Sequence, residues 1–173
     1  MSSSQELLKA HLGNDFLSFS STHDIEVVNV NGKNIVRILM ILRDVNIFSY
    51  QQLVDLSVTD YLEKHNKLEL TYHLLSHRHN KRMMVKLSVN DGDSVHTATD
   101  VFPNADWYER EAWDLFGIAF EGHPDLRRIL CDYNFVGHAL RKNFPLSGYS
   151  EVFFNKESEK VEYRPVNLTQ KFR

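Results

Sequence analysis

The sequence predicts an α+β fold, in which a two-layer domain of a mixed β-sheet with helices packed on one face is followed by an extended C-terminal arm. Segments with alternating apolar and polar residues outnumber segments with helical periodicity. Short loops link most of them, which is typical of two-layer α+β domains. Sustained periodicity ends near residue 121. We therefore expect an αβ domain over residues 1–121 and an arm that wraps a partner over residues 122–173.

Four elements are expected near the N-terminus: a helix over residues 4–12, a strand over 25–30, a turn over 31–33 and a buried helix over 35–42. Ser4 can cap the first helix. The Asn31-Gly32 pair favours a turn because both residues tolerate positive φ. Residues 35–42 are apolar almost all round, so periodicity does not decide between strand and helix. Asn34 as a possible cap favours the helix.

The middle of the chain is expected to form four strands, over residues 54–58, 68–74, 83–89 and 95–101. In the first three, every second residue is apolar, which predicts one buried face. A polar loop joins the second and third strands as a hairpin. His77 and His79 in that loop could share a face as metal ligands do. No carboxylate or cysteine at ligand spacing accompanies them, which disfavours a metal site.

A helix is expected from Asn104 to Phe116. Asn104 can cap it, Asp106 is favourable in its first turn, and Gly117 can end it. Its apolar residues share a broad face on a helical wheel. This helix is therefore expected to pack against the sheet.

Glu109 falls inside the apolar face of that helix, between Trp113 and Phe116. A lone carboxylate there is costly unless it is paired. We expect a cationic partner, and the nearest candidates in the sequence are Arg127 and Arg128. The alternative is that Glu109 reaches solvent at the helix edge.

The arm mixes turn-forming residues, arginines and aromatic residues. Pro124 can open one short turn of helix with Leu126, Ile129 and Leu130 facing inward. Residues 151–155 and 161–163 could pair as a hairpin.

Composition excludes several kinds of site. Cys131 is the only cysteine, so the chain can form no internal disulfide, no iron–sulfur cluster on its own thiolates and no zinc site built on paired CxxC motifs. The seven glycines form no nucleotide-binding loop. No apolar run approaches the about 18 residues that cross a bilayer. The N-terminal stretch resembles neither a secretory signal nor an arginine-rich transit peptide.

The net charge is −3, so no global basic field is available to hold nucleic acid. Charge is unevenly distributed: residues 1–120 carry 11 Lys and Arg against 16 Asp and Glu, while residues 121–173 carry 9 against 7. This partial segregation suits docking to an oppositely patterned partner.

Two clusters in the arm could carry chemistry. His123, Asp125 and His138, with Asp132, could form an acid–base or metal site, as in a metal-dependent hydrolase. His123 lies before a proline, and the nearby arginines disfavour a bound cation, so a structural role is preferred. A basic group could stack single-stranded nucleic acid, but the interspersed aspartates favour pairing with protein carboxylates. That group comprises Arg127, Arg128, Arg141 and Lys142.

A long signature spans residues 104–173. Its residues, to which we assign a structural and subunit-interface role, are Glu109, Arg110, Glu111, Trp113, Asp114, Gly117, His123, Pro124, Asp125, Leu126, Arg127, Arg128, Leu130, Gly137, Arg141, Lys142, Phe144 and Pro145. The pattern resembles the 30-kDa (NuoC-type) subunit of the proton-pumping NADH:ubiquinone oxidoreductase, respiratory complex I, of the mitochondrial and bacterial type. Ala139 and Asn143 depart from that family, which usually has proline and aspartate there.

The resemblance implies a cofactor-free subunit of the hydrophilic arm, with FMN, iron–sulfur clusters and quinone held by neighbouring subunits. Its expected partner is the 49-kDa-type subunit of the quinone module, with neither nucleic acid nor a membrane span of its own. It implies a peripheral position on the matrix side of the mitochondrial inner membrane, or on the cytoplasmic face in a bacterium. The arm's arginines are expected to bind partner carboxylates or backbone. A subunit of a related hydrogenase or plastid-type dehydrogenase is the alternative.

Overall fold

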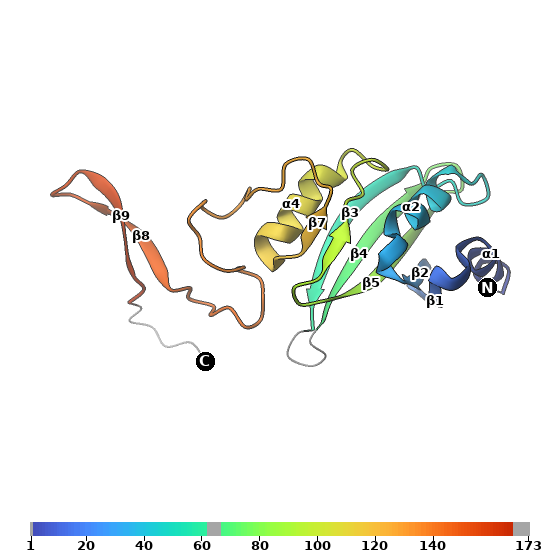
Figure 1. Ribbon diagram of the computed structural model, residues 1–173, viewed down its shortest axis with the longest axis horizontal. Coiled ribbons are helices and arrows are strands. Elements are labelled where there is room, and N and C mark those ends of the chain that lie inside the picture. The colour runs from blue at the N-terminus through green and yellow to red at the C-terminus, as the bar shows by residue number, and fades with distance from the viewer. Residues whose placement is uncertain (1, 62–66, 168–173) are drawn as a thin grey trace.

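A mixed five-stranded sheet forms the centre of the molecule. The structure is a computed structural model that describes residues 2–61 and 67–167. The strands lie in the order β1-β2-β5-β4-β3, with β2 and β5 parallel and the other neighbours antiparallel (Figure 1). Their bounds are β1 (Phe16–Thr22), β2 (Ile25–Val30), β3 (Gln52–Asp60), β4 (Lys67–Ser76) and β5 (Lys81–Asn90). The predicted mixed sheet is thus confirmed.

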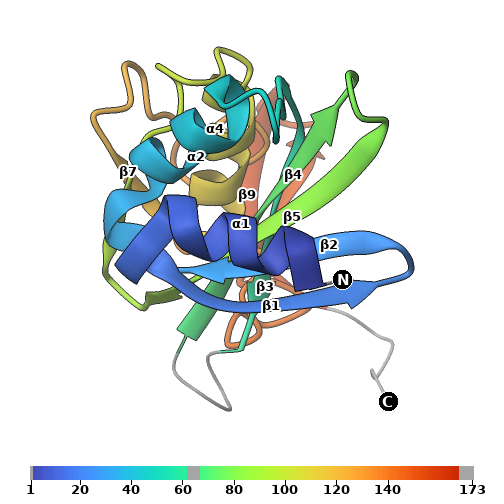
Figure 2. The same ribbon diagram turned by 90° about the vertical axis from the view of Figure 1, so that its right-hand side faces the viewer.

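Three helices contribute to one apolar core with the sheet: α1 (Ser2–Leu12), α2 (Ile35–Asp44) and α4 (Ala105–Phe116). In β4 and β5, every second side chain is buried, including Leu70, Tyr72 and Val85. Burying one such large apolar side chain contributes about 1.5–3 kcal/mol. α2 and α4 lie on the same side of the sheet (Figures 1 and 2). The alternation read from the sequence therefore marks the face that the helices cover.

Smaller elements complete the chain. They are the 3-10 turns η1 (Gly13–Asp15) and η2 (Gly32–Asn34), the parallel pair β6 (Ser94–His96) and β7 (Ala119–Glu121), and the antiparallel hairpin of β8 (Ser150–Asn155) and β9 (Lys160–Pro165). The predicted C-terminal hairpin is confirmed. No helix among the described residues is long and apolar enough to cross a membrane.

Several sequence predictions are wrong in detail. β1 was not predicted, because it is an edge strand whose exposure does not alternate. The strand expected over 95–101 ends at His96, and the chain then turns, with the Val101 and Phe102 N–H groups donating to the Ala98 carbonyl. Asn104 does not cap α4 with its side chain. Its Nδ2 instead donates to the Leu53 carbonyl, 2.8 Å away, and fixes the helix to β3.

The arm from residue 122 to residue 149 contains neither helix nor strand. The helical turn predicted at Pro124 is absent because the N–H groups of residues 129–131 donate to a side chain of α4. Leu126 packs partly against the core as expected, whereas Leu130 is 62% exposed.

Candidate functional site

Asp114, fully buried on α4, is the centre of the contact between helix and arm. Arg128 Nη1 donates to its Oδ1 at 2.6 Å, and the N–H groups of Ile129, Leu130 and Cys131 donate to its Oδ2 at 3.1, 2.8 and 2.9 Å. Burial by itself raises the pKa of Asp114, but these four hydrogen bonds outweigh it and hold the pKa at about 2. The carboxylate therefore stays ionised and organises four donors of the arm.

The arm also caps the C-terminal end of α4. The last carbonyls of a helix have no partner inside it, and cations are favoured near them. The arm supplies both donors and positive charge. The contacts are Asp114 O with Arg128 Nη1 (3.2 Å) and His138 Nδ1 (3.0 Å), Leu115 O with Leu140 N (3.1 Å), and Phe116 O with Arg141 Nε (2.6 Å).

Gly117 permits this close approach. Its φ is +76°, and a Cβ at this position would lie 2.5 Å from His138 Nε2 and 2.9 Å from Arg141 Nη2. The predicted helix stop is confirmed, and an added Cβ would also force the His138 and Arg141 side chains to shift. Gly137 also has a positive φ, +99°, and an added Cβ there would lie 3.0 Å from Cε2 of the Phe144 ring.

A second charged cluster lies toward the N-terminal end of α4. Arg110, 6% exposed, binds Asp106 at 2.9 Å and Asp125 at 3.3 Å, and Arg127 binds Asp125 at 2.9 Å. The His123 side chain is fully buried. Its Nδ1 accepts from the Asp125 N–H at 3.0 Å, so the Nε2 of the neutral ring carries the proton and donates to Asp106 at 3.2 Å. The cluster thus joins the start of the arm to the helix.

Glu109 does not pair with an arginine, so that prediction is wrong, and the helix-edge alternative is wrong too because Glu109 is fully buried. Its carboxylate accepts from the Thr97 hydroxyl at 2.5 Å and from the Ala98 N–H at 2.7 Å. Arg127 and Arg128 pair with aspartates instead. Burial raises the pKa of Glu109 to about 7, although these two hydrogen bonds oppose the rise. These hydrogen bonds join α4 to the segment that follows β6.

Some of the other signature residues make contacts within the chain, and the rest are half-buried or exposed. The Arg128 guanidinium lies 5.5 Å from the centre of the Trp113 ring, the Lys142 N–H donates to Asp60 at 2.8 Å, and Phe144 packs 5.5 Å from Phe135. Pro145 is half-buried, while Glu111, Pro124 and Leu130 are exposed.

Two residues of the site were missed by the sequence analysis. Asp91 binds Arg141 at 2.9 Å, and Asp60 accepts the Lys142 N–H. Asp91 lies between β5 and β6, and nothing in the sequence spacing connects that position with an arginine 50 positions later.

The histidine cluster predicted as an alternative does not assemble. His123 contacts Asp106 in the first turn of α4, whereas His138 contacts the carbonyl of Asp114 two turns later. His77 and His79 hydrogen-bond to Gln52 and to the Asn46 carbonyl. Within residues 2–61 and 67–167, no group of three His, Cys, Asp or Glu is placed to hold a metal ion.

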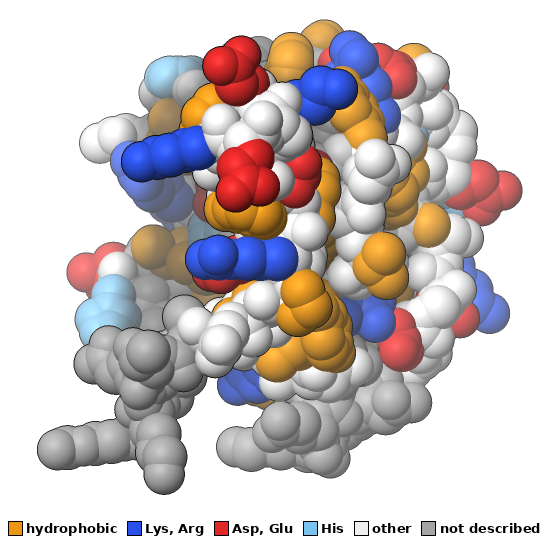
Figure 3. Space-filling view, turned by 90° about the vertical axis from the view of Figure 1, so that its left-hand side faces the viewer, with side chains coloured by type: hydrophobic (Ala, Val, Ile, Leu, Met, Phe, Trp, Pro, Cys, Tyr) orange, Lys and Arg blue, Asp and Glu red, His pale blue; other side chains and the backbone are white. Residues whose placement is uncertain are grey.

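The hairpin presents an uncovered apolar face. The register pairs Val152 with Tyr163 and Phe154 with Val161, so these four side chains share one face, where each is 53–64% exposed. Figure 3 shows hydrophobic side chains gathered on this end of the molecule between charged ones. A two-stranded hairpin is marginally stable in water, and exposed apolar patches mark interaction surfaces.

Comparison with known proteins gives a consistent result. Residues 28–150 match the family described as "Respiratory-chain NADH dehydrogenase, 30 Kd subunit". A NADH-quinone oxidoreductase subunit of Rhizobium meliloti is 47% identical over 84% of this chain and 73% of its own length. The corresponding NADH-quinone oxidoreductase subunit of Rhodospirillum rubrum is 43% identical over 96% of this chain and 78% of its own.

The fold is similar to that of a chain in the solved structure of the membrane-bound sulfane sulfur reductase, an archaeal respiratory membrane complex. The TM-score is 0.70, with 24% identity over 83% of this chain and 86% of that one. With the family match, the sequence identities and the signature clustered around Asp114, the conclusion is that this chain belongs to the family of the 30-kDa subunit of respiratory-chain NADH dehydrogenase, complex I.

Proposed function

We propose that the chain is a cofactor-free structural subunit of the hydrophilic arm of complex I, which assembles and stabilises the quinone-reducing module. One observation carries the proposal. The charged signature residues bind one another across the boundary between α4 and the arm, centred on Asp114 and Arg128. Their hydrogen bonds hold in place a strap whose outer side is apolar and exposed. A segment held in this way can bind neighbouring subunits through its exposed apolar side.

The proposed partner is the 49-kDa-type subunit of the quinone module, while FMN, iron–sulfur clusters and quinone belong to neighbouring chains. The names of the relatives, which are subunits of NADH-quinone oxidoreductases, support membership of such an assembly. We place the chain at the membrane periphery, on the matrix side in mitochondria or the cytoplasmic face in a bacterium. Arg128 and Arg141 serve the arm's own architecture, so the exposed apolar residues supply most of the partner contact.

The test is assembly against turnover in cells whose only copy of this subunit is a variant. Arg128→Ala leaves buried Asp114 without its guanidinium, and we expect a large loss of assembled complex, measured by native electrophoresis. The complex that does assemble should reduce quinone at the native rate per complex. Arg82→Ala, which removes an arginine at an exposed position of β5 outside the signature, is the matched control and should assemble normally.

Normal assembly of Arg128→Ala with lost turnover would contradict the proposal. Identification of the co-purified subunits separates complex I from a hydrogenase-type assembly in the same preparation.

A further inference from the structure

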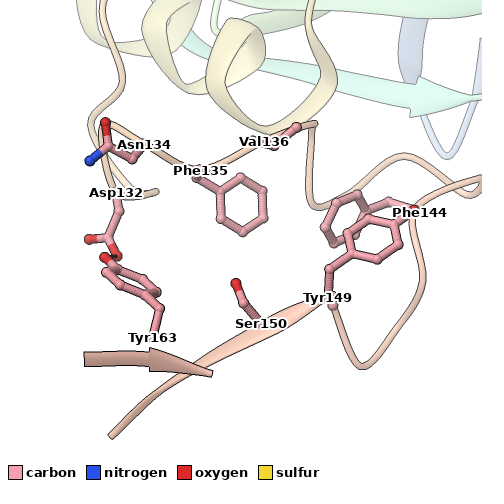
Figure 4. Close-up of a pocket in the computed structure, with 9 residues that line it drawn as sticks. Asp132, Asn134, Phe135, Val136, Phe144, Tyr149, Ser150 and Tyr163 are labelled. Carbon is pink, nitrogen blue, oxygen red and sulfur yellow. Dashed lines mark hydrogen bonds between the residues drawn. The ribbon is translucent and has the colours of Figure 1, made fainter. Parts of the chain in front are cut away.

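A cavity of about 370 Å³ lies within the arm, between residues 132–149 and the hairpin of β8 and β9. Its walls come from three stretches of the chain: the loop around Phe135, the segment from Phe144 to Ser150, and Tyr163 on β9. Figure 4 shows Phe135 and Ser150 pointing toward one another across it, with Phe144 and Tyr149 on one side and Asp132 and Tyr163 on the other.

Contacts within the chain preform these walls. The rings of Phe135 and Phe144 are 5.5 Å apart, and Tyr149 meets Phe144 edge-on at 5.4 Å. The Tyr163 hydroxyl donates to Asp132 Oδ2 at 2.9 Å and ties the hairpin to the loop. A site whose walls are fixed in advance loses little entropy on binding.

Asp132 is the one ionisable carboxylate in this lining, and it is exposed. No Lys or Arg in the described part of the chain lies within ion-pair distance of it. Its Oδ2 accepts from the Tyr163 hydroxyl, and no described residue donates to its Oδ1. An uncompensated carboxylate beside aromatic rings attracts a cation, both by charge and through the negative faces of the rings.

The Phe135 ring already attracts a guanidinium, since Arg128 Cζ lies 5.7 Å from its centre. The charge of Arg128 is balanced by Asp114, 2.6 Å away, so it does not repel a further cation as an unpaired arginine would. A planar guanidinium can stack on an aromatic ring and hydrogen-bond to a carboxylate at once, which an ammonium does less well. The lining therefore suits arginine better than lysine.

We propose that this pocket receives an arginine side chain of a neighbouring subunit, with its guanidinium stacked on an aromatic ring of the lining and hydrogen-bonded to Asp132. The proposal rests on the proposed function, because it names the chemistry by which a partner engages the arm. It makes the pocket a point of specificity within an otherwise apolar docking face.

The first experiment titrates the full chain with n-butylguanidinium and follows backbone amides by NMR. We expect saturable shifts confined to residues 132–136, 144–150 and 163. The neutral isostere n-butylurea should bind with an affinity at least about tenfold lower, because it lacks the charge. An equal response to both compounds, or no response around the pocket, would overturn the proposal.

Two variants separate charge from architecture. Asp132→Asn should weaken n-butylguanidinium binding by about tenfold. Tyr163→Phe removes the tie between hairpin and loop but keeps the carboxylate, so it should weaken binding less than Asp132→Asn does. If both variants lose binding equally, Asp132 acts only by holding the hairpin, and the proposal is wrong.

The chain's own residues 168–173, which include Lys171 and Arg173, are the competing occupant. Deleting them should leave the affinity unchanged, whereas a rise of about tenfold would assign the pocket to them and overturn the proposal.

In the assembled complex, a photoreactive phenylalanine at position 136 should crosslink to an arginine-containing peptide of another subunit. Crosslinks to peptides without arginine would contradict it. A negative result in these assays would overturn the pocket proposal alone, whereas normal assembly of Arg128→Ala with lost turnover would overturn the proposed function.

Discussion

The αβ domain and the arm are held together by different forces. In the domain, residues such as Leu70 and Val85 are fully buried against α1, α2 and α4, and apolar burial dominates. In the arm, polar contacts converge on Asp114 while large apolar residues such as Val136 and Leu146 are more than 80% exposed. The domain is held by its apolar core, whereas the segment over residues 122–149 is held mainly by a small number of hydrogen bonds.

This difference explains why most of the large exposed apolar side chains lie on the arm. Apolar packing is cooperative, so a core segment opens only with global unfolding. A segment held by a polar network opens locally when one central group is lost. An interaction surface carried by such a segment can be ordered by the scaffold and completed by a partner.

The largest effect is expected from Asp114→Ala. It leaves Arg128 buried without its counter-charge and three N–H groups without their acceptor, a loss of about 3–5 kcal/mol. Hydrogen exchange of residues 129–131 should accelerate strongly, while β4 and β5 stay protected. Equal acceleration in the sheet would show that arm and domain are one cooperative unit. Glu111→Ala, exposed on the same helix, should change neither.

Leu70→Ala should destabilise the domain and the arm together, unlike Asp114→Ala. The residue is fully buried in β4, and its truncation leaves a cavity that costs about 2–5 kcal/mol. Denaturant unfolding should shift as a whole, and exchange should accelerate in domain and arm alike, because the arm is anchored on the domain. A loss confined to the sheet would contradict this dependence.

The two buried carboxylates should respond to pH with opposite signs. The pKa of Glu109 is raised from 4.5 to about 7, so its contribution to stability is fully present below pH 4.5 and is lost as pH rises through 7, by up to about 3 kcal/mol. The pKa of Asp114 is lowered to about 2, so its contribution is present above its usual 3.8 and is lost as pH falls toward 2. Glu109→Gln should flatten the unfolding free energy between pH 5 and 8, measured with denaturant. An unchanged slope would contradict the raised pKa.

The fold was predictable wherever one face of an element is buried. The bounds of β2 match the sequence prediction, and the alternation in β4 and β5 records the face that the helices cover. β1 escaped because an edge strand with mostly exposed residues leaves no period to detect.

The sequence predicted which residues belong to the site but not which of them bind one another. The signature identified Glu109, Asp114 and Arg128, yet the expected Glu109–arginine pair does not form. Carboxylate and guanidinium lie 14 positions apart in the Asp114–Arg128 pair, on a segment without periodicity, so the path of the backbone decides which acid each arginine reaches. Glu109 accepts from the Thr97 hydroxyl and the Ala98 N–H, groups that charge patterning ignores.

The smallest of the expected effects comes from Gly117→Ala, which tests whether the arm needs space or only a left-handed residue. Positive φ costs an alanine about 1–2 kcal/mol, and here the new methyl group also meets His138 and Arg141. Gly92→Ala is the matched control, because its φ is +86° but nothing lies within 4 Å of the added Cβ. Both variants should lose stability through strain, yet only Gly117→Ala should release the arm, seen as faster hydrogen exchange at Leu140. Equal exchange in both would mean that the left-handed turn alone holds the helix end against the arm.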